Sequence, residues 1–468
     1  MKHESNSDTI AAIATARGLG GIGVIRVSGP LSLDILKSMF RKKPDDASGP
    51  DGFKARELTH GWVLDDDGKA LDEVMAVYMP GPHSFSGEDT AEIHCHGGRT
   101  VTETLLESTL ARGARLAAPG EFTRRAYLNG RLDLSQAEAV DEMISAPTRQ
   151  GVYLARNKLE GKLGQDLDDL RQKLDWLRAR LLIALDFPDE AEEEAPKERG
   201  EFLSLLQELL SRLDELVEAH ERARLWREGA LAVLAGEVNV GKSSLLNALL
   251  GRRRALVSDM PGTTRDFIEE SINVKGLPVR MVDTAGLRKL GESGDSIEAE
   301  GMELARGLFT QADLVLLLLE KMPESLSGEN AEILSKFGAK TLIVLNKSDL
   351  RPGEEAPSEL FGRPALAVSA KSGAGLKGLG DALYSLITAR SGSLNFEQAA
   401  PPTLRQRRLL ASARKELAEL SGEYASGLAP DLLSVRLDAA AARLEEVIGL
   451  AGTEDILDEV FANFCLGK

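Results

Sequence analysis

One short stretch of this chain has the residue types and spacing of a phosphate-binding loop. Residues 236–243 read GEVNVGKS, which fits the pattern G-x-x-x-x-G-K-[ST]. Glycines in such a loop let backbone N–H groups surround phosphates, and the N-terminus of the helix that follows adds a positive dipole. We expect the Lys242 ammonium to reach the β- and γ-phosphates and the Ser243 hydroxyl to bind Mg²⁺. The residues of this stretch that we expect to contact the nucleotide are Asn239, Val240, Gly241, Lys242, Ser243 and Ser244.

Three further motifs follow this loop in the order found in GTP-binding proteins. DTAG at residues 283–286 would place a carboxylate beside the Mg²⁺ and a backbone N–H on the γ-phosphate. In NKSD at 346–349, the Asp349 carboxylate can accept hydrogen bonds from the N1–H and the exocyclic amine of guanine. Adenine lacks that pair of donors, so ATP would leave a buried carboxylate unpaired. With SAK at 369–371, the expected contacts are Asp283, Thr284, Ala285, Gly286, Asn346, Lys347, Asp349, Ser369, Ala370 and Lys371.

Two positions indicate how the attacking water and the transition-state charge are handled. Signalling GTPases usually follow D-x-x-G with a glutamine that orients the water, but here Leu287 stands at that position and cannot form a hydrogen bond. Asn239 offers a hard side-chain oxygen beside the phosphates, and Thr264 is the natural second Mg²⁺ ligand. Backbone carbonyls of residues 258–266 can complete a site for a monovalent cation in place of an arginine finger. The residues alone leave two interpretations of Asn239 equally open: it binds such a cation, or it caps the loop.

The elements that position these motifs follow from apolar periodicity. Apolar runs at residues 231–234, 279–282, 342–345 and 365–368 precede the four motifs. Helix-like stretches alternate with these runs, and strands that alternate with helices predict a mostly parallel sheet. We therefore predict a Ras-like P-loop GTPase domain at residues 228–390.

Two other regions flank the nucleotide domain. Residues 1–131 mix β-rich apolar runs with helical stretches and turn pairs, which predicts an α/β domain. Apolar residues spaced by threes and fours in 150–226, and again near the C-terminus, predict a helical bundle. The proline and acidic cluster at 187–194 predicts the end of the first long helix. The simplest architecture is one helical domain, 132–227 plus 391–468, interrupted by the inserted nucleotide domain.

The composition is typical of an intracellular multidomain protein. The chain has 468 residues, which suggests about three domains. Its two cysteines, Cys95 and Cys465, cannot build a disulfide framework, which favours a reducing, cytoplasmic setting. No signal-peptide core follows the N-terminus, and the apolar run at 314–319 is far too short to span a bilayer, so we expect no membrane association. The net charge of −17 argues against a broad surface of this chain binding a phosphate backbone.

Short motifs with a fixed order occur along the whole chain. They are GIGVIRVSG at 21–29, PGPHSFSGED at 80–89, APGEFT at 118–123, LDLSQAEA at 132–139, GTTRD at 262–266 and FCLGK at 464–468. Together with the asparagine in the phosphate loop, this set resembles the MnmE (TrmE) family of tRNA-modification GTPases. The resemblance covers all three regions, and the C-terminal tail is its most specific mark. It implies that the N-terminal α/β domain binds tetrahydrofolate and forms the dimer.

The resemblance implies a defined reaction. Family members work with a flavin-dependent (FAD) partner, MnmG, in a heterotetramer or larger complex. The pair installs an aminomethyl or carboxymethylaminomethyl group at carbon 5 of the wobble uridine, position 34, of certain tRNAs. A 5,10-methylene- or 5-formyl-tetrahydrofolate supplies the one-carbon unit, and K⁺-dependent GTP hydrolysis drives a conformational cycle. Members are homodimers, and the acidic charge of this chain fits a tRNA held largely by the partner; the resemblance leaves open which tRNAs are used and whether glycine or ammonium supplies the amine.

The resemblance also assigns roles to residues. The implied K⁺ ligands are Asn239, Ser258, Met260 and Thr263, and the implied folate contacts are Arg26, Glu92, Arg131 and Lys468. A carboxylate such as Glu92 can accept paired hydrogen bonds from the amino group and ring N–H of a pterin. Arg131 stands where the family often has lysine. The arginine keeps the positive charge but changes the geometry of the contact with folate. Cys465 would lie near the folate as a small apolar side chain rather than as a catalytic group.

Because Leu287 cannot orient the attacking water, another residue must do so, and the resemblance implies which one. Glu298, in the stretch IEAEG at 297–301, would orient the attacking water through a second water and act as a weak general base. Glu300 is the nearby alternative.

A ribosome-assembly or regulatory GTPase without folate chemistry is the alternative function. The nucleotide domain alone does not separate the two, because assembly GTPases share the asparagine-bearing loop. The N-terminal domain and the terminal CLGK argue against this alternative. Binding of folate to residues 1–131 with the tail is the observation that discriminates between them.

Overall fold

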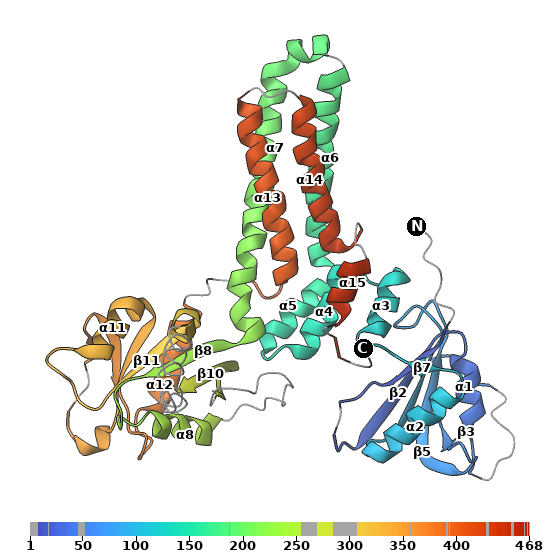
Figure 1. The fold of residues 1–468 in the computed structure, drawn as a ribbon, viewed down its shortest axis with the longest axis horizontal. Helices are drawn as coiled ribbons and strands as arrows, with labels where there is room; N and C mark the ends of the chain where they lie inside the picture. Colours follow the sequence, from blue (N-terminus) through green and yellow to red (C-terminus); the bar gives the residue numbers. More distant parts are fainter. Residues whose placement is uncertain are drawn as a thin grey trace, which may run out of the picture. The chain divides into compact units, whose positions relative to one another are not determined.

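The computed structural model describes most of the chain in two compact units. The described residues are 8–16, 18–44, 52–186, 188–253, 269–283, 307–354, 357–389, 392, 394–426, 430–450, 454–462, 464, 465 and 467. One unit comprises Met1–Ile144, Ala155–Val217 and Pro402–Lys468, and the other comprises Ser145–Leu154 and Glu218–Pro401. The first unit therefore holds the N-terminal α/β region together with the long helices (Figure 1). The boundaries predicted for three separate domains stay predictions.

The N-terminal part of the first unit is built on a seven-stranded sheet with the order β3-β4-β5-β6-β2-β1-β7. Its strands are β1 (Ile10–Ile13), β2 (Ile22–Ser28), β3 (Phe40–Arg41), β4 (Thr59–Leu64), β5 (Ala70–Met79), β6 (Thr90–His96) and β7 (Arg115–Leu116). Neighbouring strands are antiparallel, except that β1 and β7 are parallel. Helices α1 (Ser32–Met39) and α2 (Arg99–Ala111) bury apolar side chains in the same core as Ile25 and Ile93. The α/β character predicted for this region is confirmed.

Helices form the rest of the first unit. They are α3 (Glu121–Leu128), α4 (Leu134–Ser145), α5 (Arg149–Leu159), α6 (Lys162–Asp186), α7 (Pro188–Glu228), α13 (Leu404–Ala425), α14 (Pro430–Ile448) and α15 (Glu454–Ala462), of which α5 and α7 continue into the second unit. The long helices α6, α7, α13 and α14 run side by side as a bundle (Figure 1). The apolar stripe predicted along α6 is buried, for example at Leu163, Leu170 and Leu177. Within the described ranges, no helix has the length and apolar character needed to cross a membrane.

The predicted end of the first long helix is confirmed, but the acidic cluster lies elsewhere than expected. Helix α6 ends at Asp186 and α7 begins at Pro188, so residues 189–194 belong to the first turns of α7. Proline is favourable at the first position of a helix because its missing N–H would have no partner there. Carboxylates are also stabilised near a helix N-terminus by the helix dipole. The same residues that end one helix therefore begin the next.

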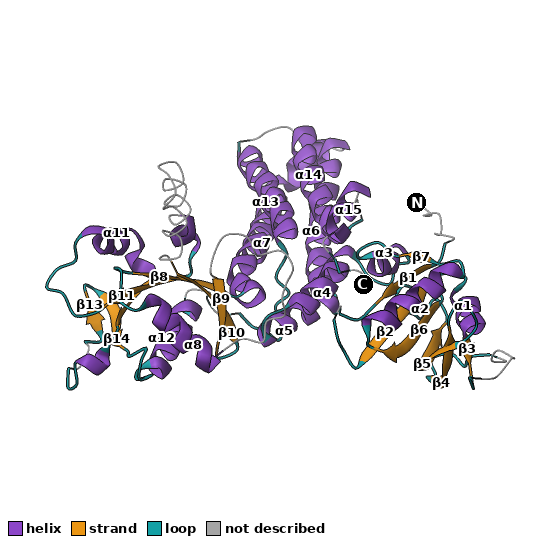
Figure 2. Cartoon of the chain, turned by 60° about the horizontal axis from the view of Figure 1, so that its bottom comes forward, coloured by secondary structure: helices purple, strands orange, loops and turns teal. Residues whose placement is uncertain are grey.

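The second unit contains the predicted, mostly parallel sheet, with the order β13-β14-β12-β11-β8-β10-β9 (Figure 2). Its strands are β8 (Ala230–Ala235), β9 (Glu269–Val274), β10 (Leu277–Asp283), β11 (Leu314–Leu319), β12 (Thr341–Leu345), β13 (Glu359–Leu360) and β14 (Arg363–Ala367). Strands β10, β8, β11, β12 and β14 are parallel, and the edge strands β9 and β13 are antiparallel to their neighbours. Around them lie α8 (Lys242–Arg253), α11 (Gly328–Phe337), α12 (Leu376–Thr388) and the short helices η1 (Gly338–Lys340) and η2 (Ser348–Leu350).

Both faces of this sheet are covered by apolar cores. Ala232 and Leu234 of β8 belong to one core, whereas Val233 and Ala235 belong to the other. Alternate residues of a strand point to opposite faces, so the whole of β8 is apolar and buried. Since the central strands are parallel, their carboxyl ends share one edge, and each of the four motifs follows such an end.

Candidate nucleotide and N-terminal sites

The phosphate-binding loop connects β8 to α8, as its sequence predicts. Gly236 and Gly241 have φ angles of 131° and 94°, which L side chains rarely adopt. A Cβ atom on Gly236 would collide with the Leu318 carbonyl, and one on Gly241 would collide with the Asn346 side-chain amide. The two glycines therefore let the loop pass close to β11 and to the NKSD motif. This close passage fixes the loop against the edge where the other motifs end.

Lys242 points back into its own loop. Its Nζ donates hydrogen bonds to the carbonyl oxygens of Gly236 at 2.7 Å and Glu237 at 2.8 Å, and the residue is only 6% exposed. The two carbonyls hold the ammonium over the curve of the loop. A buried cation in this position offers a preorganised partner for phosphate oxygens.

Ser243 and Asp283 meet at the first turn of α8. The Ser243 hydroxyl donates to Asp283 Oδ2 at 2.9 Å, and Asp283 is 7% exposed. Asp283 is the last residue of β10, which is paired in parallel with β8. A hydroxyl and a carboxylate are hard oxygen donors, and Mg²⁺ in nucleotide sites uses such donors together with phosphate oxygens and waters. The donor set therefore fits the predicted Mg²⁺ site.

Asn346 ties three of the motifs together. Its side chain is buried, with Nδ2 donating to the Val240 carbonyl at 2.9 Å and Oδ1 accepting the Ala370 N–H at 3.1 Å. The phosphate loop, the NKSD motif and the SAK motif are thus joined through one amide. The sequence placed these residues in one site, and the structure brings them together.

A hydrogen bond from Ser369 favours the ionised form of the Asp349 carboxyl. The Ser369 hydroxyl donates to Asp349 Oδ1 at 2.5 Å, and this hydrogen bond lowers the pKa of the Asp349 carboxyl below its ordinary value. Lys347 has a φ of 58° and its Nζ pairs with Glu320 at 2.7 Å, while Lys371 lies exposed in the SAK motif. An ionised carboxylate at this position suits the paired donors of guanine.

Several sequence-predicted residues lie outside the described residues. They are Ser258, Met260, Thr263, Thr264, Thr284, Ala285, Gly286, Glu298 and Lys468, together with Leu287 and Glu300. Asn239 is described and has a φ of 67°, a left-handed conformation that asparagine tolerates. This backbone angle fits the loop-capping interpretation and the cation interpretation equally, so the K⁺ site stays a prediction.

Three of the four predicted folate positions, Arg26, Glu92 and Arg131, are described, and the first two lie on strands of the N-terminal sheet. Arg26 of β2 and Glu92 of β6 are cross-strand partners, and Arg26 Nε donates to Glu92 Oε1 at 2.8 Å. The Arg26 Nη1 also donates to the Gly467 carbonyl of the C-terminal tail at 3.4 Å. Arg131 lies close to Gly87, since a Cβ atom on that glycine would be 3.2 Å from Arg131 Cγ. Arg26 therefore contacts both Glu92 and the tail, whereas Arg131 is placed only by its approach to Gly87.

The two cysteines differ sharply. Cys465 is exposed, and its carbonyl accepts the Gly120 N–H at 3.4 Å, so the tail is held against the start of α3. Cys95 is buried on β6, where burial raises the pKa of its thiol to about 11. Cys95 is therefore a small apolar core residue at neutral pH.

A buried charge cluster beside this region escaped the sequence analysis. Arg125 is 1% exposed and pairs with Asp8, Glu88 and Glu121 at 2.8, 3.0 and 3.1 Å. Arg115 also pairs with Glu121, at 2.5 Å. The residues come from four separate segments, and the only sequence signal was that Glu88 and Glu121 fall in the SGED and GEFT motifs.

The stability of this part of the protein is expected to decrease below about pH 4.5. Burial raises the pKa of Glu121, but hydrogen bonds from Arg115, the Ala118 N–H and Arg125 outweigh it and leave the pKa below its ordinary value of 4.5. The pKa of Asp8 is shifted in the same direction, because Arg115 and Arg125 outweigh its burial. A carboxyl whose pKa is lower in the folded state stabilises the fold above its unfolded pKa, and this contribution is lost as the pH falls through the folded pKa. Thermal unfolding from about pH 7 to about pH 3 measures the loss, and Glu121→Gln should make it less steep. An equally steep loss in the variant would contradict this account.

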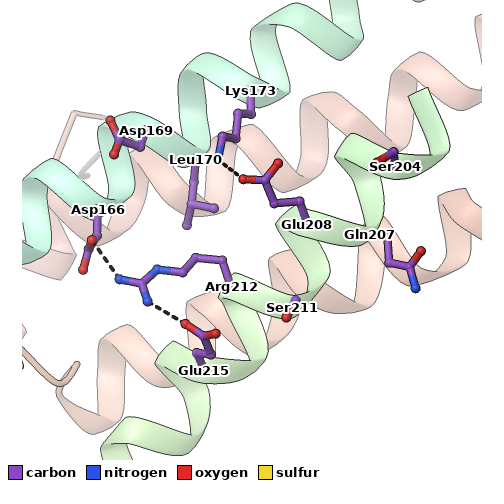
Figure 3. A pocket seen from close by; sticks show the side chains of 10 residues that line it. All are labelled: Asp166, Asp169, Leu170, Lys173, Ser204, Gln207, Glu208, Ser211, Arg212 and Glu215. Carbon is purple, nitrogen blue, oxygen red and sulfur yellow. Dashed lines mark hydrogen bonds and ion pairs between the residues drawn. The ribbon is translucent and has the colours of Figure 1, made fainter. Parts of the chain in front are cut away.

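A groove of about 480 Å³ lies between α6 and α7 (Figure 3). None of the sequence-predicted site residues lines it. Lys173 pairs with Glu208 at 2.5 Å, and Arg212 pairs with Asp166 at 2.8 Å and Glu215 at 2.6 Å. These charges satisfy one another across the bundle surface, so the groove carries no functional assignment.

Two family models together span nearly the whole chain. Residues 9–131 match the model described as "GTP-binding protein TrmE N-terminus", and residues 134–465 match the model described as "MnmE helical domain". The "tRNA modification GTPase MnmE" of Nitratidesulfovibrio vulgaris (strain DP4) is 48% identical over 470 residues, covering 100% of this chain and 100% of that protein. The protein of the same description from Lawsonia intracellularis is 41% identical, covering 98% and 100% of the two chains.

Solved structures resemble the chain only in part. The G domain of the T. maritima FeoB iron transporter is 25% identical, covers 34% of this chain and 98% of its own, and has a TM-score of 0.25. The Aquifex aeolicus Era protein bound to GDP and AlF4⁻ is 25% identical, covers 40% and 66% of the two chains, and has a TM-score of 0.26. Such low scores support no conclusion beyond the similarity itself.

Proposed function

This chain belongs to the MnmE (TrmE) family of tRNA modification GTPases, and from that premise we propose that it uses GTP hydrolysis to drive modification of carbon 5 of the wobble uridine, position 34, in certain tRNAs. It is a GTP hydrolase that acts in tRNA modification. The GTP-hydrolysing part of the proposal rests on the placement of Lys242, the Ser243–Asp283 hydrogen bond and Asp349 at one edge of a parallel sheet, and the tRNA part rests on the family. The family membership covers the whole chain and argues against the assembly-GTPase alternative.

The chain's own residues suit each part of a bound GTP. Lys242 would transfer hydrogen bonds from loop carbonyls to the β- and γ-phosphate oxygens, and Ser243 with Asp283 would hold Mg²⁺. Bound Mg²⁺ supplies charge neutralisation at the phosphates. Asp349 would accept the guanine N1–H and amine, while Asn346 keeps the phosphate loop and the SAK motif in register around the base.

We further propose that K⁺ binds beside the phosphates through Asn239, with Ser258, Met260 and Thr263 as the other ligands and Thr264 as the second Mg²⁺ ligand. Support comes from the exposed asparagine in the loop and from the hydrophobic Leu287 at the usual glutamine position. The position usually held by glutamine is therefore apolar, and a bound cation would supply the charge that other GTPases take from an arginine finger.

GTP turnover is expected to fall about a hundredfold in Glu298→Ala while GTP affinity stays unchanged, because orienting the water contributes to the transition state alone. Glu300→Ala is the matched control two residues away. Single-turnover hydrolysis in potassium and in sodium buffer, with nucleotide binding measured separately, tests both the residue and the ion. Full turnover in Glu298→Ala, or equal rates in the two buffers, would overturn the respective assignment.

For the one-carbon unit we propose a tetrahydrofolate, 5,10-methylene or 5-formyl, bound at Arg26, Glu92, Arg131 and Lys468. The Arg26–Glu92 pair is partly exposed, at 18% for each side chain, so both polar groups can reach a ligand. Glu92 retains lone pairs for the amino group and ring N–H of the pterin. The cationic side chains among the other proposed contacts suit the carboxylate tail of the folate. Bound tetrahydrofolate supplies the one-carbon group.

The proposed assembly is a homodimer that works with FAD-dependent MnmG. The net charge of −17 supports a tRNA bound largely through that partner rather than along this chain. A basic partner surface would also be attracted to the acidic protein.

The proposal is tested by nucleoside mass spectrometry of tRNA from cells lacking this chain, complemented with wild type or Lys242→Ala. We expect carbon-5-modified wobble uridines to disappear in the deletion and to return only with wild type. Lys242→Ala should fail because its buried ammonium is the cation preplaced for the phosphates. Unchanged nucleosides in the deletion would overturn the proposal in favour of the regulatory alternative.

A further inference from the structure

The loop between β5 and β6, residues 80–89, places an aromatic ring beside the Arg26–Glu92 pair. The Arg26 guanidinium carbon lies 5.7 Å from the ring centroid of Phe85 and 5.7 Å from that of Phe122. The two rings differ in their surroundings, because Phe122 is completely buried whereas Phe85 is 38% exposed. Phe122 is a core residue of α3, so only the Phe85 ring is available to a ligand at this pair.

The loop that carries Phe85 is fixed by hydrogen bonds on both sides of that residue. The Ser84 hydroxyl donates to the Glu88 carbonyl at 2.5 Å, and the Asn129 side chain donates to the Ser86 carbonyl at 2.8 Å. The Ser86 hydroxyl lies 2.7 Å from the Ser28 hydroxyl. The partly exposed Phe85 therefore lies between two anchored serines, which restrain its backbone.

Glu88 connects this loop to the buried charge cluster. Its Oε2 accepts the Ser28 hydroxyl at 2.8 Å and the Arg125 Nη1 at 3.0 Å. Arg125 is 1% exposed and also donates to the Asp8 carbonyl at 3.0 Å. A charge-assisted hydrogen bond is stronger away from water, so this contact restrains the loop more firmly than a surface ion pair would.

Strand β2 couples the two features directly. Arg26 and Ser28 are two residues apart on one strand, so their side chains lie on the same face of the sheet. Arg26 meets Glu92 and the phenylalanine rings, while Ser28 holds Ser86 and Glu88. The hydrogen bonds from Ser28 to Ser86 and Glu88 therefore tie the loop that carries Phe85 to the strand that carries Arg26.

We propose that Phe85 is a further specificity-determining residue of the folate site, contacting the conjugated ring of the ligand, and that Glu88 and Ser28 with Arg125 are positioning residues for it. The inference rests on the proposed binding of tetrahydrofolate at Arg26 and Glu92. An aromatic ring beside an arginine–carboxylate pair suits a flat, nitrogen-rich ring: the exposed part of the Phe85 ring can contact the ligand ring, and Glu92 can accept its N–H groups. The aliphatic glutamate tail of the ligand gains nothing from such a ring.

The first test measures 5-formyltetrahydrofolate binding to the full chain by isothermal titration calorimetry. Phe85→Leu keeps the apolar bulk and removes the ring face, and we expect binding to weaken about tenfold. Phe361→Leu in the second unit changes a ring of similar exposure, 37%, and should leave binding unchanged. Wild-type protein that binds no folate overturns the proposed folate site itself, whereas wild-type affinity in Phe85→Leu overturns this inference alone.

The second test separates positioning from a general structural role. Glu88→Gln keeps the shape of the side chain and removes its charge, and we expect it to weaken folate binding about fivefold with GTP hydrolysis unchanged. If Glu88 acts through Phe85, adding Glu88→Gln to Phe85→Leu should weaken binding no further, because the positioned ring is already absent. An additional fivefold loss in the double variant would show independent effects and overturn the positioning role.

Discussion

Replacing Asp349 with asparagine is expected to change the nucleotide preference of this GTPase from GTP to xanthosine triphosphate. The Asp349 carboxylate is ionised and accepts the Ser369 hydroxyl, which leaves lone pairs for the N1–H and the amine of guanine. Asparagine keeps one acceptor but turns an N–H donor toward the guanine amine, so two donors face each other. We expect GTP affinity to fall at least about a hundredfold, because a charge-assisted hydrogen bond is lost and two donors are opposed.

The rescue by a second nucleotide makes this prediction specific. Xanthine carries a carbonyl where guanine carries the amine, so the asparagine side chain can pair with both its N1–H and its carbonyl. Xanthosine triphosphate should bind Asp349→Asn more tightly than it binds wild type and should be hydrolysed by the variant. Calorimetry and phosphate release measure the two effects, with Ser348→Ala in the same motif as a control. Weakened binding of both nucleotides by the variant would mean that the base site has collapsed and would contradict the assigned role of Asp349.

The described part of the nucleotide site could be predicted because each of its motifs is local. Each motif follows an apolar run, and parallel strands bring their carboxyl ends to one edge regardless of the distance along the chain. The sequence could not predict the hydrogen bonds that fix the motifs relative to one another. Asn346 reaches Val240, which is 106 residues away, and that contact depends on β8, β11 and β12 being neighbours in the sheet.

The acidic start of α7 shows a limit of local rules. Proline and clustered carboxylates predict a helix end, and α6 does end at Asp186. The same residues are equally suited to a helix start, because proline needs no hydrogen-bond partner at the first position. Which role they take depends on whether the following segment, including Phe202 and Leu206, is buried against the bundle. Burial is a tertiary property that the local pattern does not contain.

The cluster around Arg125 shows why the N-terminal region was less predictable. Arg125 meets Asp8 from 117 residues away and Glu88 from 37 residues away. A buried arginine is rare, and its partners carry no fixed spacing in the sequence. Motif analysis found Arg26 and Glu92 through family resemblance, and only the antiparallel register of β2 and β6 placed them side by side.

A second large effect, on the stability of the first unit, is expected at the start of α13, where the chain re-enters the first unit after Pro401. Glu138 of α4 is about 10% exposed and accepts Arg405 Nε at 2.9 Å and Nη2 at 3.1 Å. It also accepts hydrogen bonds from the Gln406 amide and, at 3.4 Å, from the Thr403 hydroxyl. Thr403 and Gln406 form the capping box of α13, so one carboxylate holds the whole start of that helix. Arg405 extends the junction to the end of α14 by donating to the Val447 carbonyl at 3.2 Å.

Glu138→Ala is expected to destabilise the first unit by about 3 kcal/mol. The change leaves the Arg405 guanidinium and the Gln406 amide without their acceptor in a largely buried position, which costs far more than losing a surface ion pair. Glu208→Ala is the matched control, because Glu208 pairs with Lys173 on the bundle surface with 59% of its side chain exposed (Figure 3). For that exposed pair we expect less than about 1 kcal/mol. Denaturant unfolding followed by circular dichroism compares the two, and equal effects would contradict the role of the junction.

A double variant shows whether Glu138→Ala destabilises the first unit because it leaves a charge unpaired or because it removes packing contacts. If Glu138→Ala destabilises because a buried guanidinium is left unpaired, removing that charge should restore part of the stability. Arg405→Met keeps much of the apolar length of the side chain, so Glu138→Ala with Arg405→Met should be more stable than Glu138→Ala alone. Additive losses would instead mean that each side chain contributes through its own packing. In the first case, the junction stabilises the start of α13 through charge pairing, and this pairing is the attachment of the helix that follows the inserted nucleotide unit.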